Sequence, residues 1–321
     1  KNETSIFSKV NWHMDKNWSV YGDLQERWIS YRTSGITSDL VPLNVRQDYA
    51  FFNPKFGVTR NFGRDQLLYA SFGRSHREPR RSDFEQGVFT PERLDDFELG
   101  WRAHGQSTKG LAYKYSVVAY YMDYQNQLVL TGAIDNSGAP IRATSGRSYR
   151  AGIELEGSME LSKKWGLQSA VAWSQNKNLD FVSTFDGALQ NLGKTDISFA
   201  PSLIASGTLV YTPFEGARFS WTTRHVGDQF MSNTESTVSL LPAYTVHDVS
   251  LTYAMPKPLI GKTMSVQVLA NNIFSAVYSS NGYYYTYDDD FSVPDTITTI
   301  EGTGYYPQAL FNILAGVTLG F

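Results

Sequence analysis

Extended stretches of this sequence are joined by connections of two lengths, and short and long connections alternate strictly along the chain. Short turns such as residues 105–110 and 162–164 alternate with long connections such as residues 180–197 and 275–304. Soluble β-sandwiches and propellers show no such rule, whereas an up-and-down membrane barrel carries short turns on one rim and long loops on the other. The spacing therefore predicts an all-β fold, an antiparallel up-and-down transmembrane β-barrel.

The alternation gives about 13 strands, which is an odd number, whereas single-chain bacterial barrels have an even one. The expected strands are Thr4–His13, Lys16–Thr33, Gln47–Arg60, Gln66–Ser75, Asp95–His104, Gly110–Leu130, Ser148–Leu161, Trp165–Leu179, Ser198–Thr212, Ala217–Met231, Ala243–Met255, Thr263–Phe274 and Tyr305–Phe321. Plugged transporters have about 22 strands. We therefore expect residues 1–321 to form an incomplete barrel, with the missing strands on another polypeptide or lost by truncation.

The last stretch indicates which solvents the strands meet. Its apolar side chains fall on alternate positions, at Phe311, Ile313, Ala315, Val317, Leu319 and Phe321. The other face carries small and polar residues, including Asn312 and Thr318. A period of two indicates a strand. Because the stretch ends on an aromatic residue, we predict that one face meets lipid while the other meets the aqueous lumen of the barrel.

Composition supports a membrane barrel and excludes several other classes of protein. Aromatic residues make up 14% of the chain, which suits the aromatic girdles of a barrel. The absence of cysteine excludes a disulfide scaffold and a thiolate metal site. A net charge of −3 gives no electrostatic reason to expect nucleic acid. No apolar run reaches the roughly 18 residues of a spanning helix.

Seven segments resemble, in the same order, the C-terminal part of TonB-dependent outer-membrane receptors, in particular the iron-complex type of Bacteroidetes. They are YGDLQERWISY at Tyr21–Tyr31, SFGRSHREPRRSDF at Ser71–Phe84, PERLDDFELGWR at Pro91–Arg102, SYRAGIELEG at Ser148–Gly157, RHVGDQFMSN at Arg224–Asn233, LANNIFSAVYSSNGY at Leu269–Tyr283 and YYPQALFNILAGVTLGF at Tyr305–Phe321. Together the segments extend over nearly all 321 residues.

The resemblance implies an outer-membrane receptor for active uptake of a scarce solute, first of all an iron complex such as a siderophore or haem, energised through TonB. The N-terminal plug, the TonB-contacting segment and the early strands of such receptors have no counterpart here, so this sequence alone is expected to be transport-incompetent. The implied partners are the remaining strands and plug of the same receptor, the TonB complex, outer-membrane lipid and the ligand. The final strand of these receptors ends in the same way, so Phe321 is expected to act as a C-terminal membrane-insertion signal.

Other functions stay open from the sequence. Within TonB-dependent transport, cobalamin or a glycan is an alternative solute, and a passive porin is an alternative transporter. A soluble all-β binding module such as a lectin would also explain the aromatics and the long loops. No nucleophile motif and no metal-binding pair of histidines is present, so we do not expect an enzyme.

Six charged residues of the expected strands alternate with apolar neighbours such as Leu99, Leu155 and Val249. They are Glu98, Arg102, Glu154, Glu156, Arg224 and Asp248. A charge that faces lipid is costly, so these side chains should face the lumen. There they either line a ligand or plug contact or form a hydrated wall whose opposite charges offset each other.

A basic segment near the outer mouth is the first candidate for ligand binding. Residues 76–81 read HREPRR and contain His76, Arg77, Arg80 and Arg81. The planar guanidinium binds anionic oxygens bidentately, which fits a carboxylate or catecholate iron chelate or a haem propionate. His76 could also ligate haem iron. The alternative is a structural role in loop or plug packing.

The last long connection carries four tyrosines followed by three aspartates. Tyr283, Tyr284, Tyr285 and Tyr287 are further ligand candidates, because aromatic rings stack on sugars, porphyrins and aromatic chelators. The carboxylates of Asp288, Asp289 and Asp290 could hold Ca²⁺, the one cofactor considered. Consecutive residues of a strand point to opposite sides, so a calcium site requires a turn here. The alternative is a solvated acidic tip.

Overall fold

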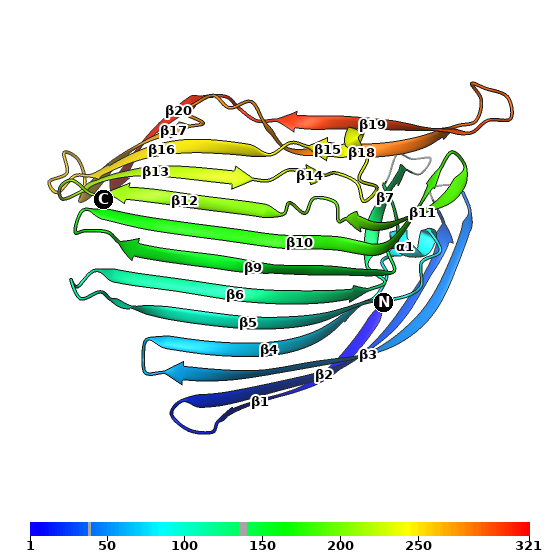
Figure 1. The fold of residues 1–321 in the computed structure, drawn as a ribbon, viewed down its shortest axis with the longest axis horizontal. Coiled ribbons are helices and arrows are strands. Elements are labelled where there is room, and N and C mark those ends of the chain that lie inside the picture. Colours follow the sequence, from blue (N-terminus) through cyan, green and yellow to red (C-terminus); the bar gives the residue numbers. More distant parts are fainter. Residues whose placement is uncertain (38–39, 135–139) are drawn as a thin grey trace.

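The computed structural model describes residues 1–37, 40–134 and 140–321. Thirteen strands form one continuous antiparallel path in a large curved sheet, which confirms the expected number (Figure 1). In order across the sheet they are β1 (Asn2–His13), β2 (Trp18–Ile36), β3 (Pro42–Phe62), β4 (Gln66–Arg77), β5 (Glu92–Gln106), β6 (Ala112–Gln125), β9 (Arg147–Glu160), β10 (Trp165–Phe185), β12 (Leu203–Tyr211), β13 (Ala217–Val226), β16 (Tyr244–Ala254), β17 (Thr263–Asn271) and β20 (Asn312–Gly320). Strands β1 and β20 are its two edges, so the described residues form an incomplete barrel.

The short turns all lie at one end of the sheet, together with the C-terminus, and the long connections lie at the other end (Figure 1). Side chains at the turns explain why the chain reverses there. Asp15 Oδ1 accepts hydrogen bonds from the backbone N–H groups of Asn17 at 2.7 Å and Trp18 at 2.8 Å. These bonds hold the pKa of the Asp15 carboxyl below its usual range. The two-rim arrangement predicted from the connection lengths is therefore confirmed.

The long connections hold more regular structure than the sequence predicted. They contain the strands β7 (Leu128–Ile134), β8 (Pro140–Thr144), β11 (Ala188–Asp196), β14 (Gln229–Phe230), β15 (Leu240–Leu241), β18 (Ser279–Asp289) and β19 (Thr298–Pro307), with helix α1 (Arg81–Glu85) and the 3₁₀ turn η1 (Thr237–Ser239). Strands β19, β18, β7 and β8 form a separate four-stranded sheet. Where both faces of a strand meet water, the apolar alternation disappears although the backbone groups still pair.

Several expected strand boundaries are wrong, because strands with water on both faces show no apolar alternation. The connection 34–46 is mostly strand, because β2 continues to Ile36, which pairs with Pro42. The expected strand 110–130 breaks at Asn126, whose φ is +56°. The expected closing strand starts too early, since residues 305–307 belong to β19. Residues 38–39 and 135–139, within two of the expected long connections, lie outside the described residues.

The wall has one apolar face and one polar face. Leu155 lies directly between Val117 and Val171 of the neighbouring strands, and Glu156 lies between Ser116 and Ala170. Since successive side chains of a strand point to opposite faces, the two rows lie on opposite sides of the sheet. Leu155 is 45% exposed, so its face is open. An uncovered apolar face fits a barrel wall in lipid, whereas the apolar faces of a sandwich meet each other.

Buried side chains gather at the loop end. Ile29, Phe51 and Phe84 are among the most buried residues of the described chain. The Phe84 ring of α1 lies 4.8 Å from the Tyr31 ring, which fixes the helix against the wall. No helix among the described residues is long and apolar enough to cross a membrane.

Candidate functional site

The six charged strand residues expected to face the lumen share the polar face of the sheet. The strand register places Arg102, Glu156 and Arg224 in one row, linked through Ser116, Ala170 and Ser206. On the same face the next row towards the long connections contains Glu154 and the row after that contains Glu98, while the next row towards the short turns contains Asp248. The geometry separates these charges from the apolar face, and their contact with a ligand or plug stays a prediction.

One aromatic ring connects two of these charges. The Tyr69 hydroxyl donates to Glu98 Oε2 at 3.3 Å, and the guanidinium carbon of Arg102 lies 5.2 Å from the centre of the Tyr69 ring. The ring lies over Gly100, its direct cross-strand partner, because a Cβ built on Gly100 would fall 2.1 Å from Tyr69 Cε1. Glycine therefore leaves the space that the ring occupies.

The opposite charges of Arg224 and Asp248 form an ion pair on the same face. Arg224 Nη2 lies 2.6 Å from Asp248 Oδ2, and Asp248 Oδ1 accepts a hydrogen bond from the backbone N–H of Asn272 at 2.9 Å. The Arg224 side chain is mostly exposed, so the ion pair contributes at most about 1 kcal/mol. This pair fits the hydrated-wall alternative.

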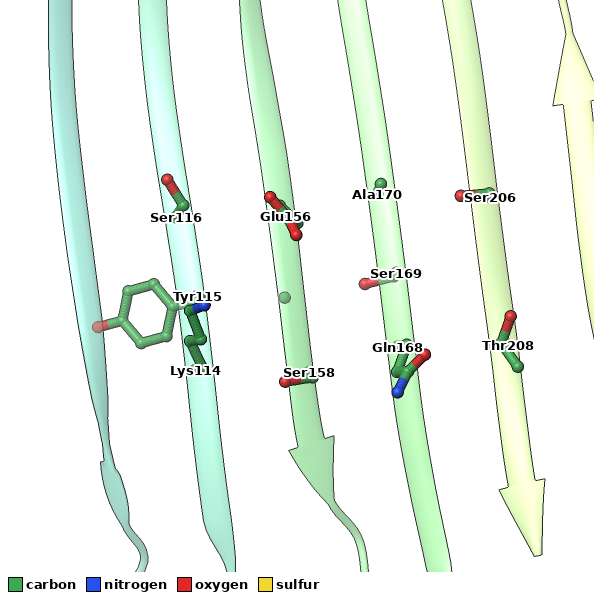
Figure 2. A pocket seen from close by; sticks show the side chains of 11 residues that line it. Lys114, Tyr115, Ser116, Glu156, Ser158, Gln168, Ser169, Ala170, Ser206 and Thr208 are labelled. Atoms are coloured by element: carbon green, nitrogen blue, oxygen red, sulfur yellow. The ribbon is translucent and has the colours of Figure 1, made fainter. Parts of the chain in front are cut away.

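Glu156 lies in a shallow hollow of about 400 Å³ on the polar face (Figure 2). The lining residues are mostly small or polar: Lys114, Tyr115, Ser116, Gly157, Ser158, Gln168, Ser169, Ala170, Ser206 and Thr208. Figure 2 shows Ser116, Glu156, Ala170 and Ser206 in one row across β6, β9, β10 and β12. Because Ser116, Ala170 and Ser206 are small, the hollow can accept a group from outside the chain, with the Glu156 carboxylate available to a cation and the Lys114 ammonium to an anion.

His76 of the basic segment is held within the protein. Its Nδ1 lies 2.8 Å from Asn53 Oδ1, and its ring lies parallel to the Phe51 ring with centroids 5.1 Å apart. These contacts fix the orientation of the imidazole. They support the structural alternative for His76, and haem ligation stays a prediction.

The arginines of the basic segment differ in their partners. Arg77 Nη2 lies 2.8 Å from Glu92 Oε2, and Arg81 Nε lies 2.9 Å from Glu85 Oε1. Arg80 is exposed at the N-cap of α1, and the described residues provide no ion-pair partner for its guanidinium. Arg80 is therefore the member of the segment best placed to meet an anionic ligand.

An ion-pair cluster beside this segment was not expected from the sequence. Arg74 donates from Nε and Nη2 to the two oxygens of Asp95, at 2.5 and 2.8 Å, and Arg93 Nη2 lies 3.4 Å from Asp95 Oδ2. The Asp95 side chain is only 10% exposed. The sequence carries no sign of the Arg74–Asp95 ion pair, because this pairing depends on how β4 is aligned with β5.

The structure divides the four tyrosine candidates between two faces of the β18–β19 hairpin. Tyr283, Tyr285 and Tyr287 share one face, with successive ring centroids 6.3 and 6.5 Å apart. Tyr284 lies on the other face, where its hydroxyl donates to Glu301 Oε1 at 2.6 Å. Burial, with the Glu301 carboxylate as second cause, raises the pKa of Tyr284. Tyr284 therefore packs the hairpin, and the other three rings remain available.

The three aspartates do not converge on one point. Asp288 Oδ1 accepts a hydrogen bond from Thr299 Oγ1 at 2.7 Å, and Asp289 Oδ1 accepts from the backbone N–H groups of Phe291 and Ser292 at 3.2 and 3.0 Å. Within residues 1–37, 40–134 and 140–321, no group of three His, Asp or Glu side chains is arranged to hold a metal ion. The geometry supports the solvated tip, and Ca²⁺ binding stays a prediction.

The remaining candidate is Phe321, at the end of β20 on the short-turn rim. Its side chain is 82% exposed on the edge of the sheet. Its role as a membrane-insertion signal stays a prediction.

A protein-family model described as "TonB dependent receptor-like, beta-barrel" matches residues 1–273. The chain belongs to the TonB-dependent receptor family. It is therefore an outer-membrane protein, and the resemblance of its ordered segments to these receptors is confirmed. In TonB-dependent receptor barrels the short turns lie in the periplasm and the long loops outside the cell. The end of the sheet with the long connections, which carries the basic segment and the β18–β19 hairpin, is thus extracellular. The Bacteroidetes iron-complex subtype stays a prediction.

Solved structures with a similar fold include import receptors and a transporter. The ferric-catecholate import receptor Fiu from E. coli K12 has a TM-score of 0.67 and 11% identity, with 98% of this chain and 44% of Fiu covered. The siderophore receptor PiuA from Acinetobacter baumannii has a TM-score of 0.66 and 16% identity, with 98% and 42% covered. The copper transporter OprC has a TM-score of 0.70 and 15% identity, with 98% and 47% covered.

The chain spans less than half the length of each of these receptors. At these identities the likeness shows the fold alone. No curated protein matches the sequence.

Proposed function

We propose that residues 1–321 are part of the barrel of an active outer-membrane transporter that takes up an iron complex, a siderophore or haem, with energy supplied through TonB. The observation that carries the proposal is the family match over residues 1–273. Structural neighbours named for ferric-catecholate import and siderophore reception support the choice of solute. Exposed Arg80 at the extracellular rim supports an anionic chelate.

The open edges of the sheet support the proposed partners. Strands β1 and β20 each pair on one side only among the described strands. Unpaired backbone groups at a sheet edge are not tolerated in hydrocarbon. The remaining strands of the same receptor would pair these edges, and a plug domain with its TonB contact would complete the transporter. The hollow beside Glu156 is one place where the plug could dock.

A second candidate solute is a copper ion or complex, because the copper transporter OprC shares the fold with a TM-score of 0.70. Cobalamin and a glycan stay alternatives within the family. The family match argues against the soluble lectin-like module and the passive porin that the sequence left open. We propose no enzymatic activity for the wall carboxylates.

Uptake by cells that carry the intact receptor tests this proposal. We expect saturable binding of one ferric siderophore or of haem, and we expect loss of its uptake when TonB is deleted, because transport needs the energy that TonB delivers. Binding would be measured side by side with haem, ferric catecholate and carboxylate chelates, copper and cobalamin. Tight binding of copper or cobalamin alone would overturn the iron proposal, and uptake that persists without TonB would overturn energised transport.

A further inference from the structure

Three tyrosines of β18 form a flat aromatic surface, which we call the aromatic ladder: Tyr283, Tyr285 and Tyr287. Tyr283 lies over Gly304 and Tyr285 over Gly302, since a Cβ on either glycine would fall 2.3 or 2.4 Å from the ring above it. Neighbouring ring planes differ by 22° and 13°. The rings therefore lie flat on the hairpin, and the outer π-face of each ring points away from the strands.

The ladder face is the free face of the hairpin. Side chains on the opposite face are engaged within the hairpin and with neighbouring loops. Tyr284 bonds Glu301 of β19, Thr299 Oγ1 accepts a hydrogen bond from the Asp186 backbone N–H at 2.7 Å, and the Tyr305 hydroxyl donates to the Leu240 carbonyl at 3.1 Å. On the ladder face, Tyr283 is 49% exposed and Tyr287 is 47% exposed. The hairpin lies with the long connections (β18 and β19 in Figure 1), and the exposure of these two rings makes its ladder face accessible from the extracellular side.

The surroundings of the ladder are acidic. Asp289 follows Tyr287 at the next position on the same face of β18. Hydrogen bonds from Ser292 hold the pKa of the Asp289 carboxyl below its usual range, so it is ionised at neutral pH. From residue 263 to residue 321 the sequence has five acidic side chains and no Lys, Arg or His. The hairpin thus offers π-faces and negative charge and has no cation of its own.

The chemistry of the ladder fits a cation from outside. Elsewhere in the described chain five cationic groups lie over six aromatic rings, as Arg102 does over Tyr69, and none lies over the ladder. The ladder rings repeat at 6.3 and 6.5 Å. Alternate residues of an extended peptide repeat at about 6.6 Å. A guanidinium or ammonium on every second residue of such a peptide would therefore meet successive rings.

We propose that the aromatic ladder and Asp289 bind an extended cationic polypeptide segment with Arg or Lys at alternate positions. Cation–π contacts to the three rings supply the specificity for spacing, and the acidic tip supplies the attraction. The proposal rests on the extracellular position of the hairpin and is independent of which solute the receptor transports.

The test measures binding of a fluorescent (Arg-Ser)5 peptide to the intact receptor at low and physiological salt. We expect saturable binding that weakens with salt, and a loss of about tenfold or more in affinity for the triple variant Tyr283→Leu, Tyr285→Leu, Tyr287→Leu. The triple Tyr→Phe variant at the same positions keeps the π-faces and should bind within about threefold of the original receptor. Tyr284→Phe, on the opposite face, is the matched control and should bind unchanged.

Four results would overturn the proposal. One is equal affinity for the Leu triple variant and the original receptor. Another is loss of binding in the Phe triple variant, because the π-faces are then not what the peptide recognises. The third is equal affinity for Arg5Ser5, which has the same composition without the alternation. An acidic (Glu-Ser)5 peptide should not bind, and saturable binding of that peptide would contradict the charge argument.

Discussion

Replacing Leu155 by arginine in the intact receptor is expected to lower the free energy of unfolding by about 2–4 kcal/mol. Leu155 lies on the apolar face between Val117 and Val171, about the middle of the strand length that crosses the hydrocarbon. A guanidinium there must stay in lipid or pull water and headgroups towards it. Urea unfolding of the receptor reconstituted in lipid bilayers measures the loss.

Ser116→Arg is the matched control for this substitution. Ser116 precedes Val117, so its depth is similar, but it lies on the polar face directly beside Glu156. The new charge would meet water, the Glu156 carboxylate on one side and the Arg102 guanidinium on the other, so attraction and repulsion offset each other and we expect a change within about 1 kcal/mol. Equal losses for Leu155→Arg and Ser116→Arg would show that the two faces do not meet different solvents.

Gly216→Ala is expected to cost about 3 kcal/mol of stability at the short turn between β12 and β13. Gly216 has a φ of +83°, a conformation that strains any residue with a Cβ. That Cβ would also fall 2.1 Å from the carbonyl oxygen of Ala254. The overlap would push β16 away and weaken the hydrogen bond of 2.8 Å from the Ala254 N–H to the Gly216 carbonyl. The midpoint of urea unfolding would report the cost.

Gly110→Ala separates backbone strain from the overlap with the neighbouring strand. Gly110 has a similar φ of +74° at another short turn, and its Cβ would meet open space. We expect a loss of about 1 kcal/mol from backbone strain alone. A loss for Gly216→Ala no larger than that for Gly110→Ala would contradict the close approach of β16 to this turn.

The strands that cross the membrane could be predicted because lipid and water impose a visible alternation on them. Leu155 and Glu156 illustrate this point. They are adjacent in the sequence but face different solvents, so hydrophobicity along the strand alternates with a period of two. Outside the membrane the constraint is lost. Both faces of the outer part of β2 are wet, so its continuation to Ile36 has no hydrophobic signature.

Contacts between strands could not be predicted, because they depend on alignment. The Tyr69 ring lies over Gly100, and Arg74 pairs with Asp95, only because β4 and β5 adopt one particular register. For the β18–β19 hairpin the sequence suggested four equivalent tyrosines. Recognising β18 as a strand would have assigned Tyr284 to the opposite face, since a strand alternates sides.

The central claim is that alternate side chains of the wall meet hydrocarbon and water. Residues 1–321 contain no cysteine, so single cysteines placed at each position of β9 from Tyr149 to Glu160 can carry nitroxide labels without background from this part of the barrel. Accessibility to oxygen, which concentrates in lipid, and to a water-soluble nickel reagent would be measured in bilayers. We predict oxygen maxima at Ile153, Leu155 and Met159 and nickel maxima at Glu154, Glu156 and Ser158. Equal accessibility to the nickel reagent along the whole strand, without a period of two, would contradict the claim.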